Sequence, residues 1–185
     1  MVTIASLWLV ILLSAVAVWL ASAVVWMVLP FHKSDFKAVS NEPAAREALK
    51  GLAPGMYNIP HMASWDDAKT PEGAQKFSEG PNAFLTVLPN RHPNMGKQLT
   101  IWFVFSLIVG TIVAYLASRT VAAGSDYLSV FRIAGTTAWL AYGMAAVQDA
   151  IWFGKPWSFV MKGQFDALLY GLLTAGVFGW LWPAA

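Results

Sequence analysis

The sequence contains no cysteine and little charge. With no Cys in 185 residues, disulfide bonds, thiolate nucleophiles and Cys-ligated metal centres are excluded. Only 12% of the residues are Asp, Glu, Lys or Arg, whereas a soluble domain carries about 25%. The twelve basic residues are spread along the chain and offset by ten acidic ones, so the charge pattern gives no support for a nucleic-acid partner. Much of the surface of this protein is therefore expected to face a solvent other than water.

Motifs for catalysis and cofactor binding are also missing. The three histidines, His32, His61 and His92, do not show metal-binding spacings such as HxxxH or HExxH. The sequence has no nucleotide-binding glycine loop and no nucleophile motif. We therefore predict no catalytic residue, no metal ligand and no cofactor, and we favour a non-enzymatic protein. One alternative stays open, an interfacial enzyme that uses His61, His92 and Asp66.

Long apolar runs are the main feature that is present. Hydrophobic residues make up 57% of the chain and the mean hydropathy is +0.54. A helix rises 1.5 Å per residue and a bilayer core is about 30 Å thick, so a span needs roughly 20 residues. The ten Trp residues suit the membrane–water boundary. Four segments meet this requirement, at about 4–29, 98–118, 128–152 and 160–182.

These segments predict an all-α integral membrane protein with four transmembrane helices. A small α/β or irregular extramembrane segment is expected between the first two helices. The predicted parts are an anchor helix at 1–30, the extramembrane segment at 31–97 and a three-helix bundle at 98–185. Ala21-Ser22-Ala23 resembles a signal-peptidase site, but no Lys or Arg precedes the apolar run, which favours an uncleaved anchor.

The polar segment 31–97 has its own local signals. Asn41 and Gly51 bracket one short helix, and Thr70 with Pro71 opens a second that ends at Gly80. Residues 56–59 and 83–88 are strand-like and predict a small sheet, with an irregular lid as the alternative.

The distribution of basic residues predicts the orientation in the membrane. By the positive-inside rule, the side richer in Lys and Arg near the spans faces the cytoplasm. We therefore expect residues 31–97 in the cytoplasm and both termini outside. The richer side holds Lys33, Lys37, Arg91, Lys97, Lys155 and Lys162, and the other side holds Arg119 and Arg132.

Small and charged residues in the spans predict two kinds of contact. Small residues let membrane helices approach closely, and basic side chains near helix ends reach toward lipid headgroups. The helix-packing contacts are expected within the chain or with a partner helix. The predicted packing residues are Gly135, Gly143, Gly171, Ala175 and Gly179, and the predicted interface anchors are Lys33, Arg132, Lys155 and Lys162.

Two acidic residues lie inside predicted spans, where ionisable groups are costly and often functional. Asp149 and Asp166 are each about one turn from the same membrane face, so they could face each other and bind a cation or relay a proton. The alternative is that each pairs with Lys155 or Lys162 at the interface. Tyr170 and Thr174 share a helix face with Asp166 at a spacing of four and complete this candidate polar site.

Five segments carry a resemblance to a known family. The chain resembles an uncharacterised family of bacterial multi-pass inner-membrane proteins, with four helices and no assigned activity. The resemblance implies a bacterial cytoplasmic membrane and a shared architecture, and it transfers no catalytic residue. The segments are 29–36 (LPFHKSDF), 54–57 (PGMY), 80–84 (GPNAF), 130–132 (VFR) and 165–176 (FDALLYGLLTAG).

Two functional hypotheses remain after these observations. The first is an accessory or scaffolding subunit of a membrane protein complex. The second is a small oligomeric ion or solute transporter or channel that uses Asp149 and Asp166. The expected partners are membrane lipids together with other membrane subunits or further copies of the chain.

Overall fold

The structure, a computed structural model, describes residues 2–185 and divides them into two compact units. The first unit comprises residues 2–36 and 94–185, and the second comprises residues 37–93. The extramembrane segment predicted at 31–97 is therefore longer than the compact second unit at both ends. Residues 31–36 pack with the helices instead, and this difference creates the candidate site described below.

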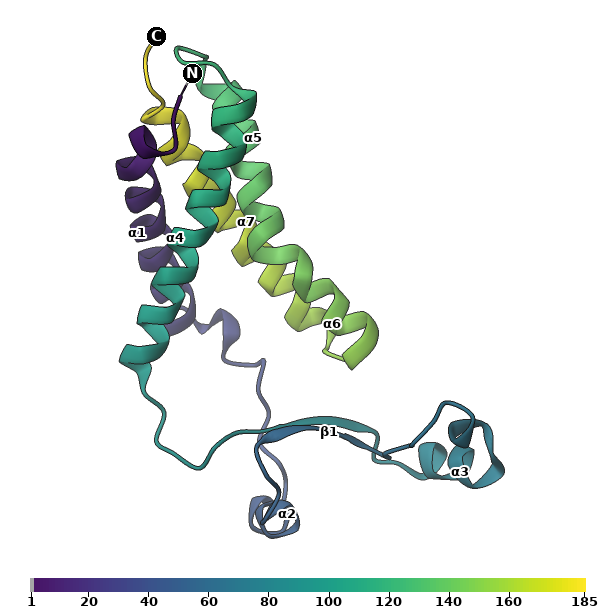
Figure 1. The fold of residues 1–185 in the computed structure, drawn as a ribbon. Helices are drawn as coiled ribbons and strands as arrows, with labels where there is room; N and C mark the ends of the chain where they lie inside the picture. The colour runs from purple at the N-terminus through teal and green to yellow at the C-terminus, as the bar shows by residue number, and fades with distance from the viewer. Residues whose placement is uncertain (1) are drawn as a thin grey trace. The chain divides into compact units, whose positions relative to one another are not determined.

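The first unit is built from four long helical segments (Figure 1). Successive segments run in opposite directions, and both termini lie at the end where α4 turns into α5. Backbone contacts hold that end together, because the Gly124 N–H donates to the Pro183 carbonyl at 2.9 Å. The segments are α1 (Trp8–Ala23) with the π-helical turn Val24–Val28, α4 (Met95–Thr120), α5 (Tyr127–Trp139) with the π-helical turn Leu140–Met144 and α6 (Ala145–Phe153), and α7 (Trp157–Trp180).

Local sequence signals explain where these helices begin and end. The Asn94 side chain caps α4 by accepting from Lys97 N, and the Asp126 side chain caps α5 by accepting from Ser129 N. Gly154 ends α6 with φ at +64°, in the left-handed conformation that glycine adopts without a Cβ penalty.

Pro30 ends the first helical segment. The residue before a proline is pushed out of the helical conformation, and Leu29 is accordingly extended, with ψ at 146°. Pro30, Phe31 and His32 then form a short 3-10 turn. The chain thereby reverses at the end of the helix, and the His32 side chain becomes buried in the first unit.

Small residues bring α5 and α7 into close contact. A Cβ added at Gly171 would lie 3.0 Å from the Gly135 carbonyl oxygen, and one added at Gly135 would lie 3.0 Å from the Ala175 Cβ. Elsewhere in the first unit, the core consists of fully buried aliphatic and aromatic side chains, among them Leu7, Val113, Val130 and Phe178.

Among the described residues, two helices are long and apolar enough to cross a membrane, Ala5–Val28 and Met95–Thr120. The segments formed by α5–α6 and by α7 carry charged side chains, such as Arg132, Asp149 and Asp166, and they are not among these candidates. Two candidate spans are thus found, and the prediction of four stays a prediction.

The second unit contains the predicted small sheet. Strands β1 (Gly55–Ile59) and β2 (Ala83–Val87) pair antiparallel, with Tyr57 opposite Leu85. Helix α2 (Glu42–Leu49) is capped by Asn41 and helix α3 (Pro71–Glu79) by Thr70, since each side chain accepts a hydrogen bond from the first turn. The helix and strand predictions for this segment are therefore confirmed, and the irregular alternative is wrong.

Candidate functional site

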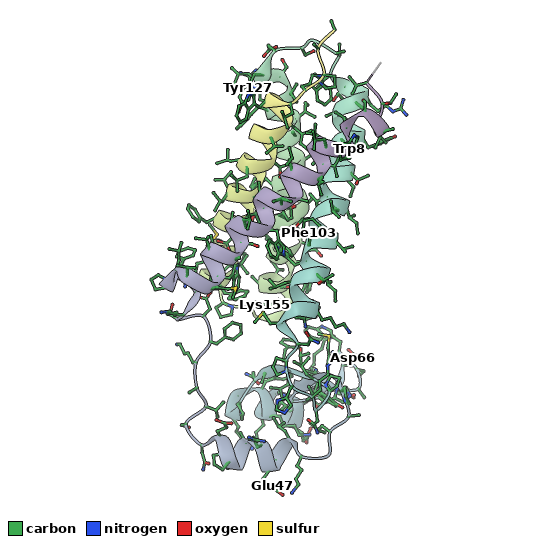
Figure 2. All side chains as sticks on the ribbon, turned by 90° about the vertical axis from the view of Figure 1, so that its left-hand side faces the viewer. Trp8, Glu47, Asp66, Phe103, Tyr127 and Lys155 are labelled. Atoms are coloured by element: carbon green, nitrogen blue, oxygen red, sulfur yellow. The ribbon has the colours of Figure 1, made fainter. Side chains whose placement is uncertain are left out.

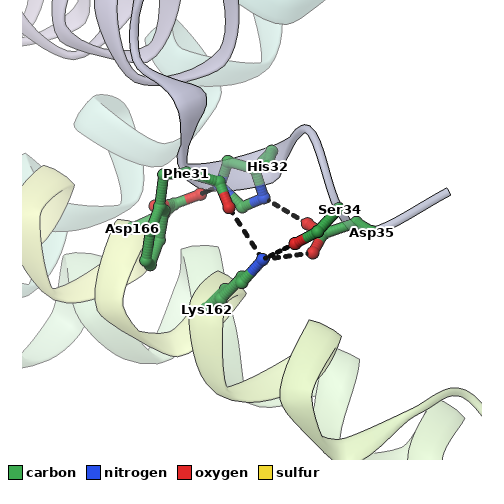
Figure 3. A network of polar contacts seen from close by, with 6 residues as sticks. All are labelled: Phe31, His32, Ser34, Asp35, Lys162 and Asp166. Atoms are coloured by element: carbon green, nitrogen blue, oxygen red, sulfur yellow. Dashed lines mark hydrogen bonds and ion pairs between the residues drawn. The ribbon is translucent and has the colours of Figure 1, made fainter.

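A buried chain of polar side chains joins the Pro30 turn to α7. The His32 imidazole lies between two carboxylates, with Nδ1 at 2.6 Å from Asp35 Oδ2 and Nε2 at 2.9 Å from Asp166 Oδ2 (Figure 3). All three side chains are about 95% shielded from solvent. Buried groups of this kind persist only when they are paired, and here each acid is paired through the same imidazole.

Lys162 closes this chain at the Asp35 end. Its ammonium donates to the second Asp35 oxygen, to the Phe31 carbonyl at 2.7 Å and to Ser34 Oγ at 3.2 Å (Figure 3). All three hydrogen bonds of an ammonium group are thus formed with residues 31–35, in the Pro30 turn and the residues that follow it. Lys162 therefore fastens that turn to α7.

Basic and acidic side chains alternate along this cluster. Lys162 contacts Asp35, and His32 contacts both Asp35 and Asp166. The hydrogen bond from Lys162 lowers the pKa of Asp35 below its usual value of 3.8, and the bond from His32 acts in the same direction against the effect of burial. Asp35 is therefore ionised at neutral pH and holds the two basic groups in place.

Aromatic rings cover the imidazole. The Trp26 ring stacks on His32 with the ring centroids 3.8 Å apart and 4° between the planes. On another side, the Phe31 ring packs edge-on at 5.0 Å. These rings keep water from the His32–Asp166 contact.

A pocket of about 510 Å³ adjoins Asp166. Its lining comes from α1, α4, α7 and the two π-helical turns, and ligand pockets in proteins commonly have volumes of about 300–1,000 Å³. The polar or aromatic residues among those that line it are Ser22, Trp26, Gln98, Trp102, Tyr142, Asp166 and Tyr170.

Each π-helical turn contributes one aromatic residue to the pocket. Trp26 lies in the turn Val24–Val28, and Tyr142 lies in the turn Leu140–Met144. Such turns add one residue per turn, which rotates the following side chains, and they occur often at functional sites. Here they direct both rings into the same pocket.

Two polar atoms at this pocket have no hydrogen-bond partner. They are Asp166 Oδ1 and the Tyr170 hydroxyl, which are both buried, although the Trp26 side chain lies near both residues. An unpaired buried polar group costs about 1–3 kcal/mol. Both residues line the pocket, so a bound molecule with hydrogen-bond donors would satisfy them.

The structure separates the two acidic residues predicted to form one site. Asp149 is half-buried and bonds Lys155 at 2.6 Å, whereas Asp166 is 3% exposed and bonds His32. Asp149 is not among the residues that line the pocket. Thr174 is buried on the same face as Asp166 and Tyr170, but it also lies outside the pocket lining.

All the predicted packing residues lie at contacts within the chain. Besides the Gly135–Gly171–Ala175 contact, Gly143 lies against Ala167 and Gln164, and Gly179 lies against the Tyr127 ring. The Gln164 amide also donates to the Gly143 carbonyl at 2.7 Å. These small residues therefore serve the fold of the first unit.

The predicted interface anchors differ in their surroundings. Lys33, Arg132 and Lys155 are exposed, and Arg132 lines a surface groove of about 230 Å³ between α5 and α7. The Lys162 side chain is only 21% exposed and binds the Pro30 turn. Its role is therefore different from the lipid anchor that the sequence predicted.

Several residues of the site were assigned no binding role from the sequence. His32 was considered for a metal-binding spacing, Asp35 was not among the predicted site residues, and Trp26 and Trp102 were counted only among the Trp residues that suit the membrane–water boundary. The available signals were Pro30, which forces a reversal at the end of an apolar run, and the His–Asp spacing of three within the turn. Neither signal reveals that the second carboxylate in contact with His32 belongs to Asp166, which is 134 positions away from it in the chain.

Comparison of the chain with protein-family models, with curated proteins and with solved structures found no match. The functional interpretation therefore depends on the geometry of the site alone.

Proposed function

We propose that this chain is a four-span, non-enzymatic protein of the bacterial cytoplasmic membrane that binds a small molecule in the pocket beside Asp166. The observation that carries this proposal is the pairing of a 510 Å³ pocket with two buried, unpartnered polar atoms on its wall. An entirely apolar cavity has no polar atoms to satisfy, whereas Asp166 and Tyr170 each place an unpaired polar atom at this pocket.

The helix dimensions support four spans. Residues 127–153 form a continuous helical segment about 40 Å long at 1.5 Å per residue, and α7 is about 36 Å long. Both are comparable in length to the candidate spans Ala5–Val28 and Met95–Thr120, and both exceed a hydrocarbon core of about 30 Å. Figure 2 shows Trp8 and Tyr127 toward one end of the bundle and Lys155 toward the other, as expected of interfacial residues.

The exposed surface supports a lipid environment. In the most apolar windows of the two candidate spans, 33% and 28% of the residues are buried within the chain. Large apolar side chains such as Leu20, Ile108 and Leu172 are about half exposed. Soluble proteins rarely expose contiguous apolar surface on this scale, so lipid is the solvent that suits these faces.

The geometry favours ligand binding over the accessory-subunit hypothesis. That hypothesis drew on small-residue helix faces, and those faces contact one another within the chain. Under the transporter hypothesis, Asp166 would remain the intramembrane acid. The residues grouped with it would be His32, Asp35 and Lys162, and Asp149 would not take part.

Native mass spectrometry of the protein released from mild detergent tests this proposal. The Gly163→Leu variant adds a bulky side chain to the wall of the pocket, because Gly163 lines it and an added Cβ would meet no atom within 4 Å. Wild-type protein should carry a bound small molecule that the Gly163→Leu variant lacks.

The matched control is Gly96→Leu, which adds the same side chain to an exposed helical position outside the pocket lining. This control should carry the same bound molecule as the wild type. Indistinguishable spectra for the wild type and Gly163→Leu would contradict the proposal.

A further inference from the structure

The pocket has an electrostatic character that selects its occupant. Asp166 is the one formally charged residue among those that line the pocket, and its Oδ1 lacks a partner. The described lining residues include no Lys, Arg or His. An anionic group such as a phosphate or carboxylate would meet no counter-ion there, and it would meet the carboxylate of Asp166.

Three aromatic rings form a wall of the same pocket. The ring centroids of Trp102 and Tyr142 are 5.9 Å apart, those of Trp102 and Tyr170 are 6.0 Å apart, and those of Tyr142 and Tyr170 are 5.5 Å apart. All three residues line the pocket. The faces of aromatic rings attract cations, and sites that recognise ammonium groups use clusters of such rings.

The unpartnered oxygens indicate the kind of cation. Asp166 Oδ1 accepts hydrogen bonds, and the Tyr170 hydroxyl both accepts and donates. A protonated primary amine brings three N–H donors, whereas a quaternary ammonium brings none and would leave the Asp166 oxygen unpaired.

The remaining lining sets the size and character of the rest of the ligand. An ammonium group fills a small part of 510 Å³. The other lining side chains include Met27, Met95 and Leu99, and Met side chains adapt to apolar ligands of varied shape.

We infer that the pocket binds an amphiphilic primary amine, with the ammonium group between Asp166 and Tyr170 against the Trp102–Tyr142–Tyr170 wall and the apolar body along the methionines. This inference rests on the proposed binding function and names the chemical class of the ligand. His32 is a positioning residue in this site, because it holds Asp166 through Oδ2 and leaves Oδ1 for the ligand.

The test compares three probes of matched shape: 2-phenylethylammonium, 2-phenylethanol and phenylacetate. Binding is measured by isothermal titration calorimetry to the full chain in lipid nanodiscs, with empty nanodiscs subtracted. The amine should bind at least tenfold more tightly than the neutral alcohol, and the carboxylate should not bind. Gly163→Leu should abolish amine binding, and Gly96→Leu should leave it unchanged.

Tyr170→Phe separates ligand recognition from folding. It removes a hydroxyl that makes no hydrogen bond of normal geometry within the protein, so the melting temperature should stay close to that of the wild type while amine affinity falls at least threefold. Asp166→Asn should lower the affinity further but also replaces the carboxylate that contacts His32, so Tyr170→Phe is the decisive variant.

The outcomes distinguish the two proposals. If the alcohol binds as tightly as the amine and Gly163→Leu abolishes both, the binding function stands and the amine inference is overturned. An unchanged amine affinity in Tyr170→Phe also overturns the inference. If no probe binds and native mass spectrometry finds no bound molecule, the binding function itself fails.

Discussion

At the scale of single residues, His32 organises the site because it contacts two carboxylates at once. A shielded ion pair contributes little net stability when it is complete, but removing one partner is destabilising, since an uncompensated charge remains. In this cluster Lys162 and His32 share Asp35. Each member therefore depends on the others, and the Pro30 turn keeps its place only while the cluster is complete.

The lowered pKa of Asp35 predicts how stability depends on pH. A carboxyl group whose pKa is lower in the folded state contributes stability that is fully present above its unfolded value of about 3.9. That contribution is lost as the pH falls through the lowered folded value. Asp35→Asn should therefore reduce the melting temperature at pH 7, and the difference from the wild type should shrink below about pH 4.

Thermal melting in detergent at a series of pH values checks this prediction. Asp149→Asn is the control, because its partner Lys155 is half exposed and surface ion pairs contribute only about 0–1 kcal/mol. A difference between the wild type and Asp35→Asn that stayed constant from pH 7 to pH 3 would show that Asp35 acts through something other than its charge.

At the scale of elements, α7 has two functions on different faces. One face packs on α5 through Gly171 and Ala175, and another carries Gly163, Asp166 and Tyr170 at the pocket. Close helix packing in a membrane depends on small residues, because lipid is as apolar as the side chains and gives no hydrophobic driving force. The rigidity of the α5–α7 pair therefore fixes where Asp166 stands.

The same substitution at two glycines of α7 should lower stability at one and not at the other. Gly171→Leu places a side chain where even a Cβ would lie 3.0 Å from the Gly135 carbonyl oxygen, and such overpacking typically costs about 1–3 kcal/mol. Gly163→Leu meets open space and replaces glycine with a better helix former, so stability should be unchanged or slightly higher. Unfolding in mixed detergent micelles measures both, and equal losses would contradict the packing described here.

At the scale of the whole molecule, the number of spans decides which segments share a compartment. Four spans place residues 37–93 and the turn between α6 and α7 on the same side, with both termini and the turn between α4 and α5 on the other. Two spans, by α1 and α4 alone, would put both of those turns on the same side. The turn before α7 therefore distinguishes the two topologies.

Single-cysteine labelling reads this topology directly, since the chain has no native Cys. Ala63→Cys, Ser158→Cys, Ala122→Cys and Ala184→Cys all replace exposed residues. A membrane-impermeant maleimide applied to intact cells should label positions 122 and 184 only, and permeabilised cells should show all four labelled. Labelling of position 158 together with position 122 in intact cells would indicate two spans.

Much of the secondary structure was predictable, because its signals are local. Asn41, Thr70 and Asp126 cap the helices that follow them through side chains three residues away, and apolar length alone identified the helical segments. The candidate site was predictable only in part. Asp166 and Tyr170 were recognised as polar residues within an apolar helix, but their partners were assigned wrongly.

The sequence by itself determined which residues must avoid water and where the helices begin and end. Those properties depend on composition and on neighbours within one helical turn. The tertiary structure alone decided that His32 reaches Asp166, that Asp149 stays apart from it, and that two π-helical turns place Trp26 and Tyr142 at one pocket. The physical reason is that the contacts depend on tertiary packing, and His32 and Asp166, for example, are 134 positions apart in the chain. Helix packing and a chain reversal set such contacts, and no local pattern encodes them.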